Sequence, residues 1–88
     1  MKVGDTIGVQ CEVRPGPFSG EQMITFDTVD GPISGFVRES ELRKQGSQWC
    51  VRAVIQNIIE DVLEVRVRGS FFTTNGIASV QRKYAMAA

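Results

Sequence analysis

From Thr6 to Arg14 the chain alternates between apolar residues and small or polar ones. The apolar set is Ile7, Val9, Cys11 and Val13, and the polar set is Thr6, Gln10, Glu12 and Arg14. Because successive side chains of a β-strand point to opposite faces, this period of two indicates a half-buried strand. The segment from Asp61 to Arg68 repeats the pattern, with apolar residues at every second position. A chain with two such segments is expected to fold around a sheet.

Turn signals divide the rest of the chain into further strands. Besides the two segments above, strands are predicted at Gln22–Val29, Ile33–Val37 and Trp49–Ile58. Pro15-Gly16-Pro17 ends the first strand, because proline cannot donate to a sheet ladder. Asp30-Gly31 is a strong signal for a tight hairpin. Gly35, in the middle of the third strand, predicts a bulge or a sharp bend.

These five strands predict an all-β fold, a small closed or nearly closed five-stranded barrel that forms a single domain over residues 1–88. Closure suits a short chain because it removes exposed strand edges. Glu39–Lys44 is predicted to be a short helical connector between strands three and four. Residues 69–88 form a C-terminal appendage, in which Ser70–Thr74 and Ile77–Val80 pair as a hairpin and Gln81–Ala88 is a short helix or a frayed tail. No internal repeat is detectable.

The composition narrows the functional classes. Ten basic residues balance ten acidic ones, which argues against avid, nonspecific DNA binding. Histidine is absent and cysteine occurs only at positions 11 and 50, so no metal site, no cofactor and no catalytic activity are expected. Both cysteines lie in strand segments and are expected to be buried. No apolar run is long enough to span a bilayer, and a cytoplasmic domain without a membrane partner is the expectation.

Two segments carry a family resemblance. Val3-Gly4-Asp5 precedes the first strand, and Gly35-Phe36-Val37-Arg38-Glu39-Ser40-Glu41-Leu42 ends the third. Together they resemble the S1-type RNA-binding domain, one of the oligonucleotide/oligosaccharide-binding (OB) barrels. The resemblance implies a five-stranded OB barrel that binds RNA. Arg38 replaces the family's usual histidine, Glu39 replaces an apolar residue, and the second strand lacks the exposed aromatic residues of the family. An SH3-like barrel is the alternative fold.

The leading functional hypothesis is a noncatalytic module that binds single-stranded RNA or DNA. Its predicted site residues are Arg38, Arg52, Arg66, Arg68, Phe36 and Phe18. Arginine suits this role because it contacts phosphate and stacks on bases, and each aromatic–base stack contributes about 1–3 kcal/mol. The same arginines would otherwise form cross-strand pairs with Glu12, Glu39 and Glu64 on a solvated face.

The alternative function is a protein-interaction or self-assembling module, with a protein partner or a homo-oligomer as its complex. Its contact residues would be Phe18, Phe71 and Phe72. Phe18 lies in the proline-rich loop between the first two strands, where a rigid backbone presents it. The pair Phe71-Phe72 follows the fifth strand, where an aromatic side chain more often closes the open end of a barrel than contacts a partner.

Overall fold

The computed structural model of the chain describes residues 1–71 and 75–87, most of which lie in β-strands. The strands are β1 (Thr6–Pro15), β2 (Glu21–Thr28), β3 (Gly31–Arg38), β4 (Leu42–Gln45), β5 (Gln48–Ile59), β6 (Val62–Val67), β7 (Ser70–Phe71), β8 (Ile77–Gln81) and β9 (Ala85–Ala87). Two short 3-10 helices interrupt them, η1 (Glu39–Glu41) and η2 (Arg82–Tyr84), and the described residues contain no α-helix.

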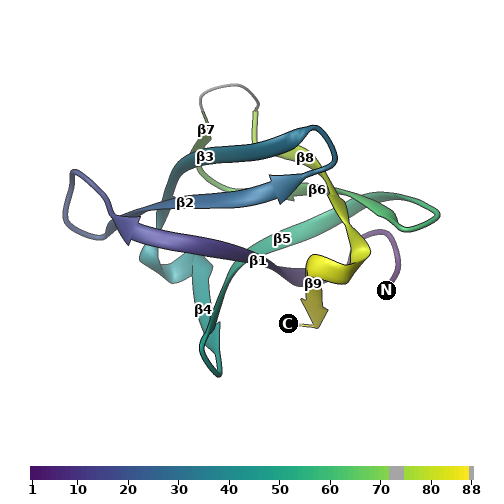
Figure 1. Cartoon of the computed structure of the whole chain (residues 1–88), viewed down its shortest axis with the longest axis horizontal. Helices are drawn as coiled ribbons and strands as arrows, with labels where there is room; N and C mark the ends of the chain where they lie inside the picture. Colours follow the sequence, from purple (N-terminus) through teal and green to yellow (C-terminus); the bar gives the residue numbers. More distant parts are fainter. Residues whose placement is uncertain (72–74, 88) are drawn as a thin grey trace.

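All nine strands belong to one antiparallel sheet that curls strongly into a half-barrel (Figure 1). Its main path runs β7-β3-β2-β1-β5-β6-β8, while β4 pairs with β5 and β9 pairs with β1 outside that path. The turn between β2 and β3 approaches β8, at the far end of the path, where the Val29 N–H donates to the carbonyl oxygen of Ser79 (2.9 Å). The curled sheet therefore encloses its core along one face.

The core confirms the alternating patterns of β1 and β6. Its buried members are Ile7, Val9, Cys11, Ile24, Phe26, Val37, Val51, Ala53, Ile55, Leu63, Val65, Val67, Ala78 and Val80. Every second residue of β1 and of β6 faces this cluster, because side chains of a strand alternate between its faces. The arginines of β5 and β6 consequently lie on the opposite, outer face.

The centre of the molecule is the antiparallel pairing of β1 with β5. Val9 lies opposite Val51 in this pairing, and both side chains are fully buried. The same order of elements occurs twice, once starting from β1 and once from β5: β1-β2-β3-η1-β4 and β5-β6-β8-η2-β9. Each succession is a three-stranded meander, followed by a 3-10 turn and a short strand that pairs with the first strand of the other succession. The fold is thus a structural repeat with an approximate two-fold axis through the Val9–Val51 pair.

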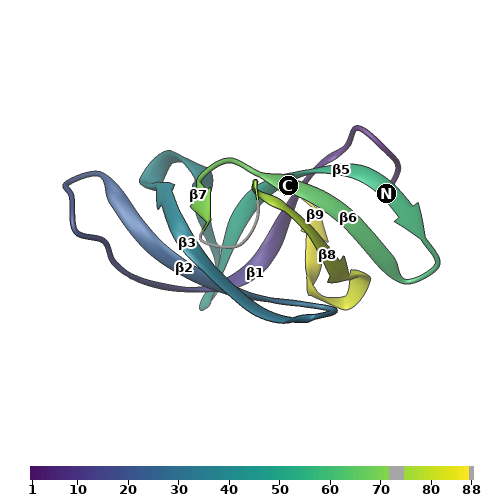
Figure 2. The ribbon, with the colours of Figure 1, turned by 90° about the horizontal axis from the view of Figure 1, so that it is seen from above.

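Local details of the two halves agree. The N–H of Glu39, the first residue of η1, donates to the carbonyl oxygen of Gly20 (3.0 Å), and the N–H of Arg82, the first residue of η2, donates to that of Asp61 (2.7 Å). Gly20 and Asp61 each lie just before the second strand of their half. The β1–β2 and β5–β6 turns project at opposite ends of the molecule (Figure 2). The repeat is undetectable in the sequence because equivalent positions carry different side chains.

The predicted all-β class is confirmed, but the predicted closed or nearly closed five-stranded barrel is wrong. The described residues form nine strands in a half-barrel, of which seven lie on the main path. Of the predicted helical connector Glu39–Lys44, only the three residues of η1 are helical. Leu42–Gln45 forms β4, which pairs with β5. Strands of three or four residues, such as β9 and β4, are too short to show a period of two and are stabilised by their neighbours in the sheet.

The predicted pairing of the C-terminal appendage is also wrong. Ile77–Gln81 (β8) pairs with β6, while Ser70–Phe71 (β7) pairs with β3, so the two strands do not form a hairpin with each other. The rest of the predicted strand, residues 72–74, lies outside the described residues. The last segment is helical only over Arg82–Tyr84 (η2), and Ala85–Ala87 is not a frayed tail, because it forms β9 and pairs with β1.

Gly35 does not form the predicted bulge. Its strand pairs with β2 in unbroken register, and the irregularity of the sheet lies instead between Ile55 and Asn57 of β5. Gly35 is required for another reason, since a Cβ atom there would lie 2.6 Å from the carbonyl oxygen of Ser70 and would clash with the ring of Phe71. The glycine permits β7 and the Phe71 ring to approach the backbone of β3.

If the Val9–Val51 pair is the common centre of both halves, truncating either residue should cost the same. We expect Val9→Ala and Val51→Ala each to lower the free energy of unfolding by roughly 2 kcal/mol, since each removes two buried methyl groups and leaves a small cavity. Urea denaturation measures the effect. Val54→Ala, on the outer face of β5, is the control and should cost less than half as much. A large loss for one valine and none for the other contradicts the symmetric packing.

Gly35→Ala is expected to lower the free energy of unfolding by about 1–3 kcal/mol, because the new methyl group overpacks against Ser70 and Phe71. Thermal denaturation followed by circular dichroism provides the measurement. Asp27→Ala, an exposed position on β2, is the control and should shift the midpoint little. A Gly35→Ala variant as stable as the parent chain would show that β7 does not pack on β3 as described.

Candidate functional site

The site is built around the 3-10 turn η1 at the end of β3. Two hydrogen bonds fix this turn besides its own: the Glu39 N–H donates to Gly20, and the Gln22 side-chain amide donates to the Glu39 carboxylate (2.9 Å). Arg38 immediately precedes η1 in extended conformation, and the Leu42 N–H closes the turn on the carbonyl oxygen of Glu39. The turn therefore holds Ser40 and Glu41 at a defined place beside the outer face of the sheet.

A hollow of about 520 Å³ opens next to this turn. We call it the η1 hollow; it is lined by Glu21, Phe36, Arg38, Ser40, Glu41, Arg68, Gly69 and Ser70. The pairing of β3 with β7 places Ser70 opposite Phe36. A Cβ atom on Gly69 would lie 2.6 Å from the carbonyl oxygen of Phe36, so glycine is needed where the chain from Arg68 crosses to β7.

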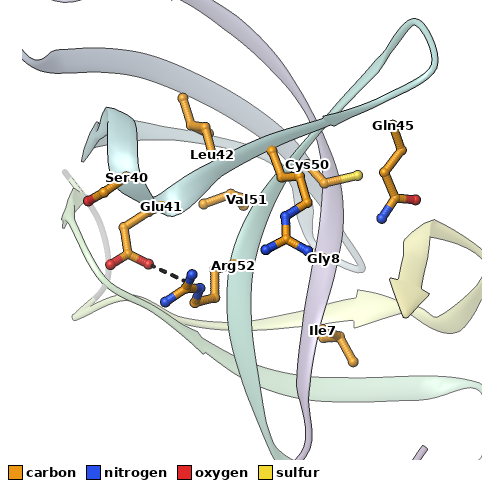
Figure 3. A pocket seen from close by; sticks show the side chains of 10 residues that line it. Ile7, Gly8, Ser40, Glu41, Leu42, Gln45, Cys50, Val51 and Arg52 are labelled. Atoms are coloured by element: carbon orange, nitrogen blue, oxygen red, sulfur yellow. Dashed lines mark ion pairs between the residues drawn. The ribbon is translucent and has the colours of Figure 1, made fainter. Parts of the chain in front are cut away.

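A smaller cavity of about 60 Å³ lies on the other side of η1 (Figure 3). It shares Ser40 and Glu41 with the η1 hollow, and Gly8, Cys50 and Arg52 also line it. The Glu41 carboxylate faces Arg52 across this cavity, with Oε2 4.0 Å from the guanidinium Nε. The volume corresponds to about two water molecules, so a ligand larger than that must reach Glu41 from the η1 hollow.

The Glu41 carboxylate is the least satisfied polar group of the site. Its side chain is 12% exposed, whereas that of Arg52 is 54% exposed. Oε2 is buried, and no donor in the described part of the chain forms a hydrogen bond with it. The distance of 4.0 Å to Arg52 is too long for a hydrogen bond. A buried carboxylate oxygen without a donor is uncommon, because its desolvation is left uncompensated.

The structure brings part of the predicted nucleic-acid site together. Phe36, Arg38 and Arg68 line the η1 hollow, and Arg52 adjoins it through Glu41. Arg66 lies further along β6, opposite Val54 on β5, and lines neither cavity. Phe18 is 70% exposed in the β1–β2 turn and is likewise outside the hollow.

The predicted residues of the alternative interaction surface do not lie together on one surface. Phe71 is half-buried, and its ring meets that of Phe26 edge to face with centroids 6.0 Å apart. This packing agrees with the predicted role of closing the core rather than with that of an exposed anchor. Phe72 lies outside the described residues. Phe18 alone remains as an exposed aromatic contact of the predicted set.

Sequence reasoning missed Ser40, Glu41 and Ser70 as site residues. Ser40 and Glu41 belong to the segment that carries the S1-type resemblance. That segment contained the available signal, because a polar break directly after a strand places side chains at the rim of a sheet. Ser70 could not be found, since its place in the hollow depends on the pairing of β7 with β3.

Several positions near η1 carry other residues in the second half. A hollow of about 370 Å³ beside η2, here the η2 hollow, is lined by Gln10, Cys11, Glu12, Thr25, Phe26, Asp27, Pro32, Gln48 and Tyr84. Under the approximate two-fold axis, Gln81, Gln10 and Asp27 stand where the first half has Arg38, Arg52 and Arg68, and Tyr84 stands in the place of Glu41. Arg82 and Lys83 of η2 stand where η1 has Glu39 and Ser40, and they line a hollow of about 570 Å³ that is the counterpart of the η1 hollow. The fold therefore does not require arginine at these positions.

The two cysteines have the environment of core residues. Both are free and buried. Burial raises the pKa of the Cys11 thiol to about 12, with a smaller contribution from Cys50, and burial also raises the pKa of Cys50. Cys50 Sγ lies 3.3 Å from Met86 Sδ. Among the described residues no three histidine, cysteine or acidic side chains cluster as metal ligands.

Comparison of the chain with protein-family models, with curated proteins and with solved structures finds no match. Within residues 1–71 and 75–87 there is no helix of the length and apolarity that crossing a membrane requires.

The raised thiol pKa values predict slow cysteine chemistry in the folded chain. At pH 8 both thiols should react with Ellman's reagent far more slowly in the native protein than in urea, because the reactive thiolate is scarce and covered. In the unfolded chain the Cys11 thiol has its ordinary pKa of 9.0 and ionises above that pH, whereas in the folded chain it stays protonated up to about pH 12. Stability should therefore fall as the pH rises through that window. Rapid stoichiometric labelling of the native protein contradicts the buried placement.

Proposed function

We propose that the chain is a noncatalytic module that binds single-stranded nucleic acid, RNA or DNA, at the η1 hollow. Arg38, Arg68 and Arg52 contact the phosphate backbone, and Phe36 contacts a base. The observation that carries the proposal is that Arg38, Arg68 and Phe36 line one hollow. In the second half, Gln81 and Asp27 stand at the places of Arg38 and Arg68, whereas η2 has cations of its own, Arg82 and Lys83.

The place of these two arginines matters because the overall charge of the chain is zero. A neutral domain attracts nucleic acid only where its cations gather locally. Arg38 and Arg68 are exposed at the mouth of one hollow, and exposed guanidinium groups form bidentate contacts with phosphate. Glu21 and Glu41 line the same hollow, so the proposed phosphate contacts depend on these two guanidinium groups and not on a net positive charge.

The chemistry of the lining also suits a nucleotide. Ser40 and Ser70 present hydroxyl groups to the η1 hollow, and Phe36 presents a half-buried ring. The volume of about 520 Å³ lies within the range of small-molecule sites. Single-strand binders combine such a cationic groove with an aromatic surface for bases.

The S1-type resemblance supports the same region. Phe36, Arg38, Ser40 and Glu41 all belong to the segment from Gly35 to Leu42 that resembles the S1-type and OB domains, and all four line the η1 hollow. The resemblance and the charge distribution are independent observations, one of sequence order and one of position in space. Both direct the proposed nucleic acid to η1.

A second candidate function is protein interaction. Among the described residues, Phe18 (70%) and Ile59 (64%) are the two most exposed large apolar side chains, and they lie at the two projecting turns. Exposed apolar residues on projecting turns suit contact with a protein partner or with further copies of the chain. Single exposed apolar residues are also common on surfaces that bind nothing, so this candidate ranks second.

Fluorescence anisotropy with a labelled single-stranded RNA of mixed sequence tests the proposal. We expect micromolar binding at 50 mM salt that weakens strongly at 200 mM. Arg38→Ala and Arg68→Ala should each weaken binding about five- to tenfold at low salt and reduce the slope of log K against log salt by about 1. Arg82→Ala, an exposed cation of η2, is the matched control and should bind as the parent chain does.

Two results would contradict the proposal. Absence of binding at 50 mM salt removes nucleic acid as the ligand and leaves protein interaction as the better candidate. Equal losses for Arg82→Ala and Arg38→Ala would mean that binding depends on total charge rather than on the η1 hollow.

A further inference from the structure

The sheet has two outer faces that are equivalent under the approximate two-fold axis, one over β1 and β2 and one over β5 and β6. Glu12 lies opposite Thr25 on the first face, and Val54 lies opposite Arg66 on the second. The axis therefore places Thr25 at the position of Arg66. The two faces share one arrangement of strands, and only their side chains make them different.

The first of these faces is acidic, and the η2 hollow opens on it. The carboxylates of Glu12 and Asp27 line this hollow, both residues are exposed, and none of the lining residues is cationic. Two cations lie outside the lining. Lys83 Nζ is 5.2 Å from the ring centroid of Tyr84, and Arg14 follows Glu12 by two residues along β1. We call this surface, defined by Glu12 and Asp27, the acidic face.

The second face is basic. Arg66 and Arg68 are exposed on the same side of β6, where Glu64 is the neighbouring carboxylate two residues before Arg66. The residues opposite Arg66 are both apolar, Val54 on β5 and Ile77 on β8, so neither neutralises its charge. Neither arginine of β6 takes part in an ion pair among the described residues. We call this surface, defined by Arg66 and Arg68, the basic face.

We propose that the chain associates with itself head to tail, with the basic face of one copy docked on the acidic face of the next. Arg66 and Arg68 reach the η2 hollow of the neighbouring copy and pair with Glu12 and Asp27. Arginine suits this contact because its planar guanidinium bonds to a carboxylate through two parallel hydrogen bonds. This association goes beyond the nucleic-acid function proposed above, because Arg66 and the acidic face lie outside the η1 hollow.

A second copy of the chain is the occupant that the charges favour. Nucleic acid is attracted to the basic face and repelled by the acidic one, whereas another copy satisfies both faces at once. Ten acidic residues balance ten basic ones, so two copies do not repel each other as a whole. The charge of the chain is thus divided between two faces that attract each other.

Apolar side chains beside the charges add contact area. Val54 and Ile77 flank Arg66 with 39% and 36% of their surface exposed, and Pro32 and Tyr84 line the η2 hollow. Interfaces between proteins are enriched in tyrosine and arginine. The charged pairs are therefore surrounded by surface that excludes water when the two faces meet.

The position of the two faces determines the kind of assembly. They lie on different halves of the molecule, so each docked copy leaves one acidic and one basic face unused. Such a contact is heterologous and builds a ring or an open chain of copies rather than a symmetric dimer. Since exposed ion pairs are individually weak and are screened by salt, the association should need a high protein concentration and low salt.

Sedimentation velocity of the whole chain at rising protein concentration tests the proposal. At about 50 mM salt the average mass should rise above that of a dimer as the concentration approaches about 1 mM, and at about 500 mM salt it should return to that of one chain. Asp27→Arg and Arg66→Glu should each remain monomeric at low salt, because each reverses one of the two faces. Circular dichroism checks that both variants are folded.

A mixture of these two variants is the sharpest measurement. The Asp27→Arg chain keeps a normal basic face and the Arg66→Glu chain keeps a normal acidic face, so an equal mixture should form dimers that contain one of each and should not grow further. Glu60→Arg and Lys2→Glu are the matched controls. They change the net charge by the same amounts at exposed positions outside the two faces, and each should associate as the parent chain does.

Three results would overturn the proposal. The first is a parent chain that stays monomeric at about 1 mM protein and low salt, and the second is association of either face variant as strong as that of the parent. The third is a mixture of the two face variants that does not associate. None of them bears on the nucleic-acid proposal, whose test uses Arg38 and Arg68 at the η1 hollow.

Discussion

The pairing of β1 with β5 is the interaction on which the rest of the structure depends. One edge of β1 pairs with one edge of β5. The second edge of β1 pairs with β2 and β9, and the second edge of β5 pairs with β6 and β4. Val9 and Val51 meet at the centre of this arrangement with no exposed surface. Loss of this pairing would separate the two halves of the core, because no other strand pair joins them along the main path of the sheet.

Because the two halves share one backbone arrangement, the positions at which their side chains differ are informative. The two halves share strand order, turn geometry and the hydrogen bond that anchors each 3-10 turn. Side chains that serve only the fold need to be apolar on the inner face and have few requirements outside it. The arginines and the buried carboxylate near η1 exceed those requirements, since Gln10 and Tyr84 stand at the places of Arg52 and Glu41 in the second half. The cations of η2, Arg82 and Lys83, stand in turn where η1 has Glu39 and Ser40. The comparison of the two halves thus takes the place of a comparison between relatives.

Much of the sheet could be predicted from the sequence, and the reasons for the failures are physical. The alternation of β1 and β6 and the Asp30-Gly31 turn are local signals, and the structure confirms them. The strands β4 and β9 were missed because three or four residues carry no period and depend on pairing with distant strands. In the site, Arg38 and Phe36 were predicted from one continuous segment. The proximity of Arg68 and Glu41 depends on tertiary packing and could not be derived from spacing.

The most direct test of the account is to map a bound oligonucleotide on the two halves by NMR. Backbone amide shifts of the ¹⁵N-labelled chain would be followed during titration with a short single-stranded RNA of mixed sequence. The account predicts changes at Phe36–Glu41, at Arg52 and at 68–70, with little change at the equivalent positions around η2. Changes of similar size around both 3-10 turns, or changes confined to η2, would contradict the claim that one half of a symmetric frame carries the site.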